Sequence, residues 1–246
     1  MGFLGIQYEF RWSVLWEAPY GQWLLEGIGM TLSLAAVGWL VACGLGLFFG
    51  ALRTVPVRPL RALAAGYVEF FRNVPLLVWL FFWYFGVPQV LPPAAQAWIN
   101  ARGVECWAAV TGLSVYHGAR LAEVIRAGIQ AVPSTQLEAA LATGLSMSQA
   151  YRHVLVPIAL RLVIPPATSE ALNLLKNSSL ALTIGVGELT FMTRQIESYT
   201  ARGFEAITAG TLLYLLLCLM VAGLMGRLER RVAIPGLIAR VGRAEH

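Results

Sequence analysis

The sequence predicts an all-α integral membrane protein. Of its 246 residues, 58% are hydrophobic and only 13% are charged, and the mean hydropathy is +0.66. Soluble domains usually carry charge on about 25% of their residues, so this chain has about half the usual share. A helix of about 20 apolar residues crosses a bilayer. Five stretches approach that requirement and are the predicted spans: 27–52, 73–101, 104–131, 154–187 and 206–226.

The first 26 residues do not resemble a secretory signal. They carry four charged residues and have no basic start followed by an apolar run. Seven aromatic residues favour instead a segment that lies among the lipid headgroups. These are Phe3, Tyr8, Phe10, Trp12, Trp16, Tyr20 and Trp23. We therefore expect residues 1–26 to form an interfacial segment that precedes the membrane domain.

Three of the predicted spans, 27–52, 73–101 and 206–226, contain no charged residue. In the first, the spacing of Gly46 and Gly50 allows close contact with another helix, a weak signal in a chain with 24 glycines. In the second, Pro92 and Pro93 interrupt the apolar run. Because proline does not continue a helix, we expect that helix to end near Leu91.

The span 104–131 carries charges inside the membrane, where a charge is costly and is a functional hypothesis by default. Arg120, Glu123 and Arg126 recur at intervals of three residues, so they share one helical face. We expect Glu123 to pair with both arginines, which leaves one net positive charge. A structural role in holding helices together is the favoured interpretation of Glu123 and Arg126.

The span 154–187 also carries polar groups. Pro165-Pro166, Gly185 and Gly187 predict breaks in this helix. Non-helical backbone at membrane depth is tolerated where it lines a cavity. The residues between the breaks are therefore candidates for a cavity lining, and packing of a subunit interface is the alternative. They include Glu170, Asn173, Lys176, Asn177, Ser178 and Ser179.

Five spans place the termini on opposite sides of the membrane. With the N-terminus outside, ten arginines lie inside and four lie outside, which satisfies the positive-inside rule. The inner set is Arg53, Arg58, Arg61, Arg72, Arg152, Arg227, Arg230, Arg231, Arg240 and Arg243, and the outer set is Arg11, Arg102, Arg194 and Arg202. We predict one membrane domain over residues 27–231 and an inner tail over 232–246.

The segment 134–157, between the third and fourth spans, predicts two short helices. Thr135 and Glu138 fit a capping box at the first start, and Ser146 and Gln149 fit one at the second. Gly144 suits the left-handed residue that ends a helix. On these residues alone, an ordinary helical loop in which Glu138 only caps is the alternative.

The same segment resembles the EAA loop of ABC-importer permeases. It reads Glu138-Ala139-Ala140, three residues, Gly144, nine residues, and then Val154-Leu-Val-Pro157. The similarity extends over nearly the whole chain, including Gly29-Met-Thr-Leu-Ser, Val68-Glu-Phe-Phe-Arg-Asn-Val-Pro75 and Glu123-Val-Ile-Arg126. Two narrower runs, Lys176-Asn-Ser-Ser179 and Val232-Ala-Ile-Pro235, are similar to those of glutamate/aspartate importer permeases.

The resemblance implies the type I permease fold, with five transmembrane helices, a periplasmic N-terminus and a cytoplasmic C-terminus in the bacterial inner membrane. It implies that loop 134–157 couples the chain to a dimer of ATPase subunits. The implied coupling residues are Glu138, Ala139, Ala140, Gly144, Ser146 and Arg152. The other implied partners are a second permease subunit, either a distinct homologue or a second copy, a periplasmic amino-acid-binding protein, and membrane lipid. Nucleic acid is not among them.

Composition excludes several activities. The chain has no Asp, and its single Lys176 follows Leu175 rather than Gly, so it contains no P-loop and cannot hydrolyse ATP in that way. We expect no catalytic residue, no metal site and no bound cofactor in this chain. ATP and magnesium would be held by the partner ATPase.

The function predicted from these features is import of acidic amino acids, glutamate or aspartate. Arg120 resembles an arginine of glutamate/aspartate permeases, and its fork of donors fits a carboxylate. The expected substrate pathway comprises Arg120, Glu123, Asn173, Lys176, Asn177 and Ser178. Two alternatives remain: the same machine for glutamine, arginine or histidine, and a self-sufficient secondary carrier, for which the EAA match would be chance.

Overall fold

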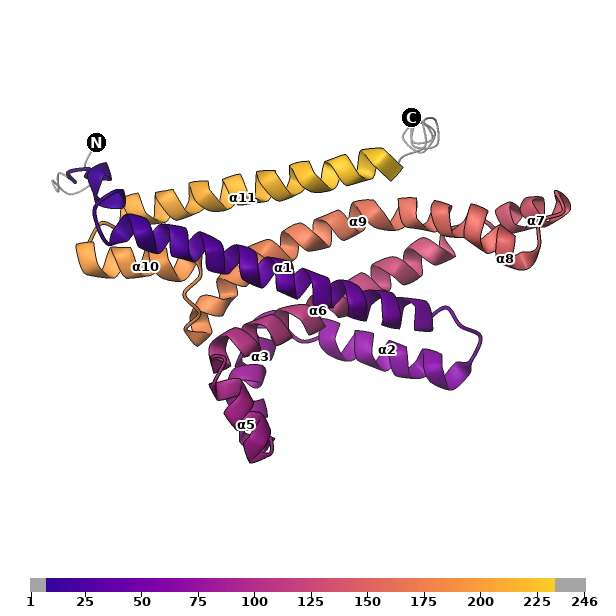
Figure 1. Ribbon diagram of the computed structural model, residues 1–246, viewed down its shortest axis with the longest axis horizontal. Helices are drawn as coiled ribbons and strands as arrows, with labels where there is room; N and C mark the ends of the chain where they lie inside the picture. The colour runs from indigo at the N-terminus through magenta and orange to yellow at the C-terminus, as the bar shows by residue number, and fades with distance from the viewer. Residues whose placement is uncertain (1–7, 233–246) are drawn as a thin grey trace. The chain divides into compact units, whose positions relative to one another are not determined.

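In the computed structural model, which describes residues 8–232, every regular element is a helix (Figure 1). The four longest are α1 (Tyr20–Leu52), α6 (Val104–Gln130), α9 (Val156–Asn177) and α11 (Gly203–Val232). Between α1 and α6 lie α2 (Arg58–Arg72), α3 (Leu76–Phe81), the π-helix η2 (Phe82–Gly86), α4 (Val87–Val90) and α5 (Pro93–Asn100). The remaining elements are η1 (Trp12–Leu15), α7 (Ser134–Ala142), α8 (Met147–Ala150), the π-helix η3 (Tyr151–Leu155), the 3-10 helix η4 (Ser178–Ile184) and α10 (Leu189–Thr200).

Three helices are long and apolar enough to cross a membrane: Tyr20–Leu52, Met147–Ile184 and Gly203–Val232. The pair Arg58–Arg72 and Leu76–Val90 meets the same criterion jointly but is bent by 98°. The described residues therefore contain three or four such spans by length and composition. Helix α6 is long enough, but its polar and charged side chains keep it outside this set, and the five-span arrangement stays a prediction.

The chain divides into two compact units. The first comprises Met1–Val41, Val74–Tyr116 and Asn173–Leu219, and the second comprises Ala42–Asn73, His117–Leu172 and Met220–His246. The structural description covers residues 8–41 of the first unit and residues 220–232 at the end of the second. Each of the four longest helices contributes residues to both units.

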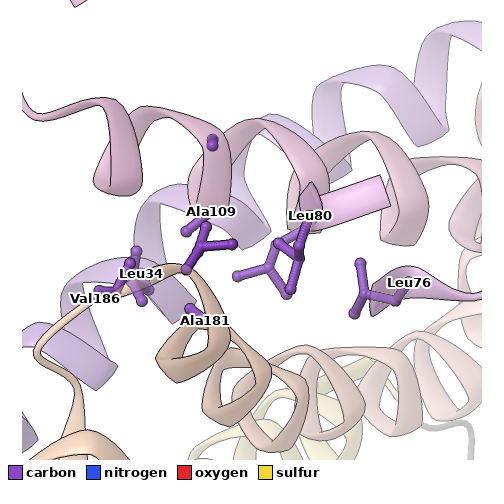
Figure 2. Close-up of a cluster of buried hydrophobic side chains, with 9 residues drawn as sticks. Leu34, Leu76, Leu80, Ala109, Ala181 and Val186 are labelled. Carbon is purple, nitrogen blue, oxygen red and sulfur yellow. The ribbon is translucent and has the colours of Figure 1, made fainter. Parts of the chain in front are cut away.

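The first unit is held together by an apolar core (Figure 2). Leu34 of α1, Leu80 of α3, and Ala109 and Leu113 of α6 are at most 2% exposed. Ala181 of η4 is fully buried in the same cluster. Because alanine side chains are small, α6 and η4 approach their neighbours closely, and the leucines fill the space between them.

The second unit depends on close packing of α1 against α6. A Cβ atom on Gly46 would lie 2.8 Å from Cγ of Leu121, and one on Gly50 would lie 2.9 Å from the carbonyl oxygen of Ala122. Real Cβ atoms do not approach that closely, so both positions require glycine. The close contact predicted from the Gly46 and Gly50 spacing is confirmed.

Two predictions about α3–α4 and α9 have different outcomes. The helix after α3 ends at Val90, and Leu91 is extended, as the Pro92-Pro93 pair predicted. The predicted break at Pro165 and Pro166 is wrong, because α9 runs through both prolines to Asn177. Neighbouring groups compensate for missing backbone donors in such helices.

The irregular backbone near the end of α9 begins only at Ser178. From there η4 continues to Ile184, and Gly185 adopts a left-handed conformation with φ of 87°. Asn173 and Lys176 are therefore on a regular helix rather than on broken backbone. Residues 53–72 carried no helix prediction, and the structure forms α2 there, with Pro59 in its first turn.

Candidate functional site

Loop 134–157 forms a helical hairpin at the N-terminal end of α9 (Figure 1). The two predicted short helices are present as α7 and α8, and η3 joins α8 to α9. Gly144 has φ of 85° and ends α7, as predicted. The capping box at α8 is confirmed: the Ser146 N–H donates to the Gln149 side chain at 2.9 Å, and the Gln149 N–H donates to Ser146 Oγ at 3.4 Å.

The predicted capping box at the start of α7 is wrong. Pro133 is the N-cap residue, and no side chain caps this helix end. The helix starts two residues earlier than the box required, because Pro133 supplies the extended backbone that precedes the first turn. Among the described residues, Glu138 makes no ion pair or hydrogen bond through its carboxylate. The alternative interpretation, in which Glu138 only caps the helix, is therefore wrong.

The hairpin presents an exposed mixed surface. Glu138, Ala139, Gly144, Ser146 and Arg152 are all exposed, whereas Ala140 is 6% exposed and packs inside the hairpin. Three apolar side chains lie exposed beside them: Leu141 at 38%, Met147 at 54% and Tyr151 at 49%. An exposed carboxylate among small and apolar side chains suits contact with another protein.

A second cluster joins α6 to α9 within the second unit. Arg120 donates from Nε to Glu170 Oε2 at 2.8 Å and from Nη2 to Glu170 Oε1 at 2.9 Å. His117 Nδ1 lies 3.3 Å from Glu170 Oε2. His117 is fully buried and the Glu170 side chain is 8% exposed, whereas the Arg120 side chain is 39% exposed. This is a two-pronged ion pair with a buried imidazole beside it.

The prediction that Glu123 pairs with both Arg120 and Arg126 is therefore wrong for Arg120. Glu123 binds Arg126, which is three residues along the same helix, and Arg53, which follows α1. Arg72 Nη1 lies 3.9 Å from the same carboxylate. Arg120 turns instead to Glu170, fifty residues away in sequence. The i,i+3 spacing placed the three charges on one face but could not identify partners supplied by other helices.

The polar residues at the end of α9 have separate environments. Ser178 is fully buried and donates to the Leu175 carbonyl at 2.7 Å. Lys176 is exposed, and it lines a cavity of about 560 Å³ together with residues of η4, α10 and α11. Asn173, Asn177 and Ser178 are not part of that cavity lining. The sequence predicted that these three residues line one cavity together with Lys176, and this cavity contains only Lys176 of that set.

A buried carboxylate that sequence reasoning missed organises the neighbouring turn. Glu188 is fully buried and caps α10 by accepting from the Thr190 and Phe191 N–H groups at 2.9 and 2.8 Å. Tyr214 of α11 donates to the same carboxylate at 2.6 Å. Burial raises the pKa of Glu188. The signal available in the sequence was an acidic residue immediately before a helical segment.

The N-terminal segment is fixed to the start of α11 within the first unit. Arg11 donates its backbone N–H to Glu205 at 2.7 Å, and the Tyr8 hydroxyl donates to the same carboxylate. The hydrogen bond to Glu205 raises the pKa of Tyr8. Phe10 and Trp12 lie against Phe204 with ring centroids 5.2 and 6.1 Å away. Phe3, one of the seven aromatic residues in the prediction, lies outside the described residues.

Comparison with known proteins identifies the family. Residues 42–234 match the family described as binding-protein-dependent transport system inner membrane component. The chain belongs to this family. The matched region includes loop 134–157, both charged clusters and Lys176. The expectation that the chain resembles importer permeases is thereby confirmed, and the EAA match is not chance.

Relatives within the family cover almost the entire chain. The glutamate/aspartate import permease protein GltJ of Escherichia coli strain K12 is 40% identical, over 93% of this chain and 97% of the relative. The glutamine transport system permease protein GlnP of the same strain is 33% identical, over 92% and 99%. A crystal structure of an amino acid ABC transporter with histidines has a TM-score of 0.77 and 30% identity, over 92% of this chain and all of that one.

Proposed function

We propose that this chain is the transmembrane permease subunit of an ATP-driven importer for the acidic amino acids glutamate and aspartate. The observation that carries the proposal is the 40% identity to a glutamate/aspartate permease along nearly the full length of both chains. The lower identity to the glutamine permease extends over a comparable share of this chain, which keeps glutamine import as the second candidate. The secondary-carrier alternative is set aside, because the family is defined by binding-protein-dependent transport.

The proposed assembly contains three further kinds of protein. Two ATPase subunits hold ATP and magnesium, a second permease subunit completes the pathway, and a binding protein delivers the amino acid from the outer side. The second permease is either a homologue or another copy of this chain. The chain would lie in the bacterial inner membrane with five spans and its N-terminus outside, so that loop 134–157 faces the ATPases.

The coupling surface proposed is the exposed hairpin α7–α8. Its carboxylate at Glu138 is not used inside the chain, Ala139 offers a small surface for close docking, and Leu141, Met147 and Tyr151 are exposed. The capping box at Ser146 and the left-handed Gly144 hold the two helices in a fixed relation. A rigid hairpin transmits a displacement of the ATPase to α9, which continues directly from it.

The proposed pathway keeps the residues predicted from sequence, with one change in their chemistry. Arg120 already binds Glu170 through two of its nitrogens, so a substrate carboxylate would compete with Glu170 rather than neutralise an isolated charge. Glu123 is surrounded by Arg53 and Arg126 and would act through helix packing. Lys176 is the cation of the predicted set that lines an open cavity.

The decisive test is uptake by the reconstituted assembly. The chain is co-expressed with its partner subunits, placed in proteoliposomes with the binding protein outside, and supplied with ATP inside. We expect ATP-dependent uptake of labelled glutamate and aspartate, with glutamine, arginine and histidine transported at least about tenfold more slowly. The chain purified alone should show no ATP hydrolysis. If glutamine is taken up in preference to glutamate, the substrate assignment is wrong. Uptake without ATP or without the partner subunits would overturn the proposal of ATP-driven import.

A further inference from the structure

A cavity in the first unit carries chemistry that the family assignment does not explain. It has a volume of about 560 Å³, within the range of about 300–1,000 Å³ typical of small-molecule sites. Its charged lining residues are Lys176, at the end of α9, and Arg194 on α10. Residues of α11 also line the cavity, among them Gly210, Thr211 and Tyr214. The two cations come from different elements, and the other lining residues are neutral.

The cations are available to a ligand to different degrees. Within residues 8–232, Lys176 takes part in no ion pair, and its neighbour is Asn177 rather than an acidic residue. Arg194 binds Glu197 at 2.9 Å, but its side chain is 61% exposed, so this pair is weak. An uncompensated lysine in a membrane protein is costly, because charge is poorly solvated there. An anionic ligand would offset that cost.

The hydroxyl groups of the cavity complete the pattern. Ser179 donates to the Lys176 carbonyl at 2.7 Å, Thr193 donates to the Thr190 carbonyl at 2.8 Å, and Thr211 donates to the Ile207 carbonyl at 2.8 Å. A hydroxyl has one proton and two lone pairs, so each of these groups has given its proton to the protein. Their oxygens remain as acceptors, which suit an ammonium group rather than a carboxylate.

The hydroxyl protons of Tyr214 and Thr190 are also donated within the protein. Tyr214 donates to the buried Glu188, and Thr190 donates to the Tyr214 hydroxyl oxygen at 3.3 Å. The chain of bonds fixes the Tyr214 ring at the cavity wall. The cavity therefore offers two cationic donor groups, Lys176 and Arg194, and otherwise hydroxyl oxygens whose protons are committed.

We propose that this cavity binds a dicarboxylic amino acid, with one carboxylate at Lys176, the other at Arg194, and the α-ammonium group at the hydroxyl oxygens of Thr193 and Thr211. A ligand with one carboxylate leaves one cation unpaired, so the site discriminates glutamate from glutamine. This inference rests on the proposed function and assigns it a specificity-determining site that includes Arg194, Thr193 and Thr211, which sequence reasoning did not single out.

Ligand binding in the cavity can be followed through Cys218, which is one of the lining residues and is partly exposed. In a complex in which Cys43 and Cys106 are replaced by Ala, a maleimide can label Cys218 in this chain. We expect saturating glutamate to slow the labelling at least about tenfold, and glutamine to slow it little. Lys176→Met and Arg194→Gln should remove the protection by glutamate.

The matched control is Arg11→Gln. Arg11 is an exposed arginine paired with a nearby glutamate at 2.9 Å, as Arg194 is, but it is not part of this cavity. It should keep both protection and uptake. In proteoliposomes, Lys176→Met should lower glutamate uptake at least about tenfold, the loss expected for one hydrogen bond between charged groups. Thr193→Val should weaken protection by glutamate but not by glutarate, which lacks the ammonium group.

The outcomes separate the two proposals. If the wild-type assembly imports glutamate but Cys218 is not protected, or if both cation variants import it at the wild-type rate, the cavity is not the site and the inference is wrong. If glutamate protects Cys218 in an assembly that imports only glutamine, the cavity binds dicarboxylates and the proposed transport function fails. Equal protection by glutamate and glutamine overturns the assignment of the second carboxylate to a cation.

Discussion

The ion pair between Arg120 and Glu170 gives the sharpest stability prediction. Replacing Glu170 with Gln keeps the shape of the side chain but removes the charge that faces Arg120 at 2.8 and 2.9 Å. Fully exposed pairs contribute about 0–1 kcal/mol. Removing one partner of a fully buried pair costs about 3–5 kcal/mol.

This pair lies between those limits, because the Glu170 side chain is 8% exposed and the Arg120 side chain is 39% exposed. Water reaches the guanidinium and screens it after the carboxylate is lost, so we expect Glu170→Gln to cost about 2–3 kcal/mol. For a chain of this size, 1 kcal/mol shifts Tm by about 2–4 °C, so the expected decrease is about 4–12 °C.

The measurement is thermal unfolding of the purified assembly in detergent, followed by tryptophan fluorescence. Glu17→Gln is the control, because it breaks the exposed Arg11–Glu17 pair, whose side chains are 59% and 40% exposed, and should shift Tm by at most about 2–4 °C. The double variant Arg120→Gln with Glu170→Gln should recover part of the loss, since it leaves no unpaired charge. If Glu170→Gln is no less stable than Glu17→Gln, or if the two single losses add fully in the double variant, the pair does not support the fold.

Four further substitutions test other contacts. Gly50→Leu should destabilise the second unit by more than about 3 kcal/mol, because even a Cβ would lie 2.9 Å from the Ala122 carbonyl; wild-type yield and Tm would contradict the α1–α6 packing. Thr31→Val should cost about 1–3 kcal/mol, because it leaves the buried Leu189 N–H without the hydroxyl that accepts it at 3.1 Å; Ser33→Ala, which changes an exposed hydroxyl, serves as its control and should be nearly neutral. Gly144→Pro and Glu138→Arg should leave the chain in the membrane but separate ATP hydrolysis from uptake, since proline cannot adopt a φ of 85° and arginine reverses the exposed charge; unchanged uptake per ATP in both variants would remove loop 134–157 from coupling.

Local signals in the sequence were sufficient where neighbouring residues decide the structure. The end of the helix near Leu91 follows from two prolines, the capping box at Ser146 follows from Gln149 three residues later, and the left-handed residue follows from Gly144. Each of these features is settled within one turn of helix. The spacing of Gly46 and Gly50 also succeeded, because the need for close approach leaves few other residues possible.

The sequence was insufficient where distant groups compensate for a local preference. Pro165 and Pro166 each remove a backbone donor, yet α9 continues through both positions to Asn177. At the start of α7, the N-cap residue is Pro133 rather than Thr135, which was expected to form a capping box with Glu138. Lys176 could be named in advance, but Arg194 could not, because only the fold brings α10 to the same cavity.

The ion pairs that α6 makes with other helices change how an Arg120 variant must be tested. Glu123 and Glu170 face four arginines, Arg53, Arg72, Arg120 and Arg126, which leaves two net positive charges, and this excess lies around Glu123 rather than at Arg120. Loss of glutamate uptake in Arg120→Ala would therefore not demonstrate contact with substrate, because that change also leaves Glu170 without its arginine. The informative variant is Arg120→Ala combined with Glu170→Gln, which removes both charges together. If Arg120 binds a substrate carboxylate, the double variant should remain inactive while recovering stability; if uptake returns with stability, Arg120 serves only to hold α6 against α9.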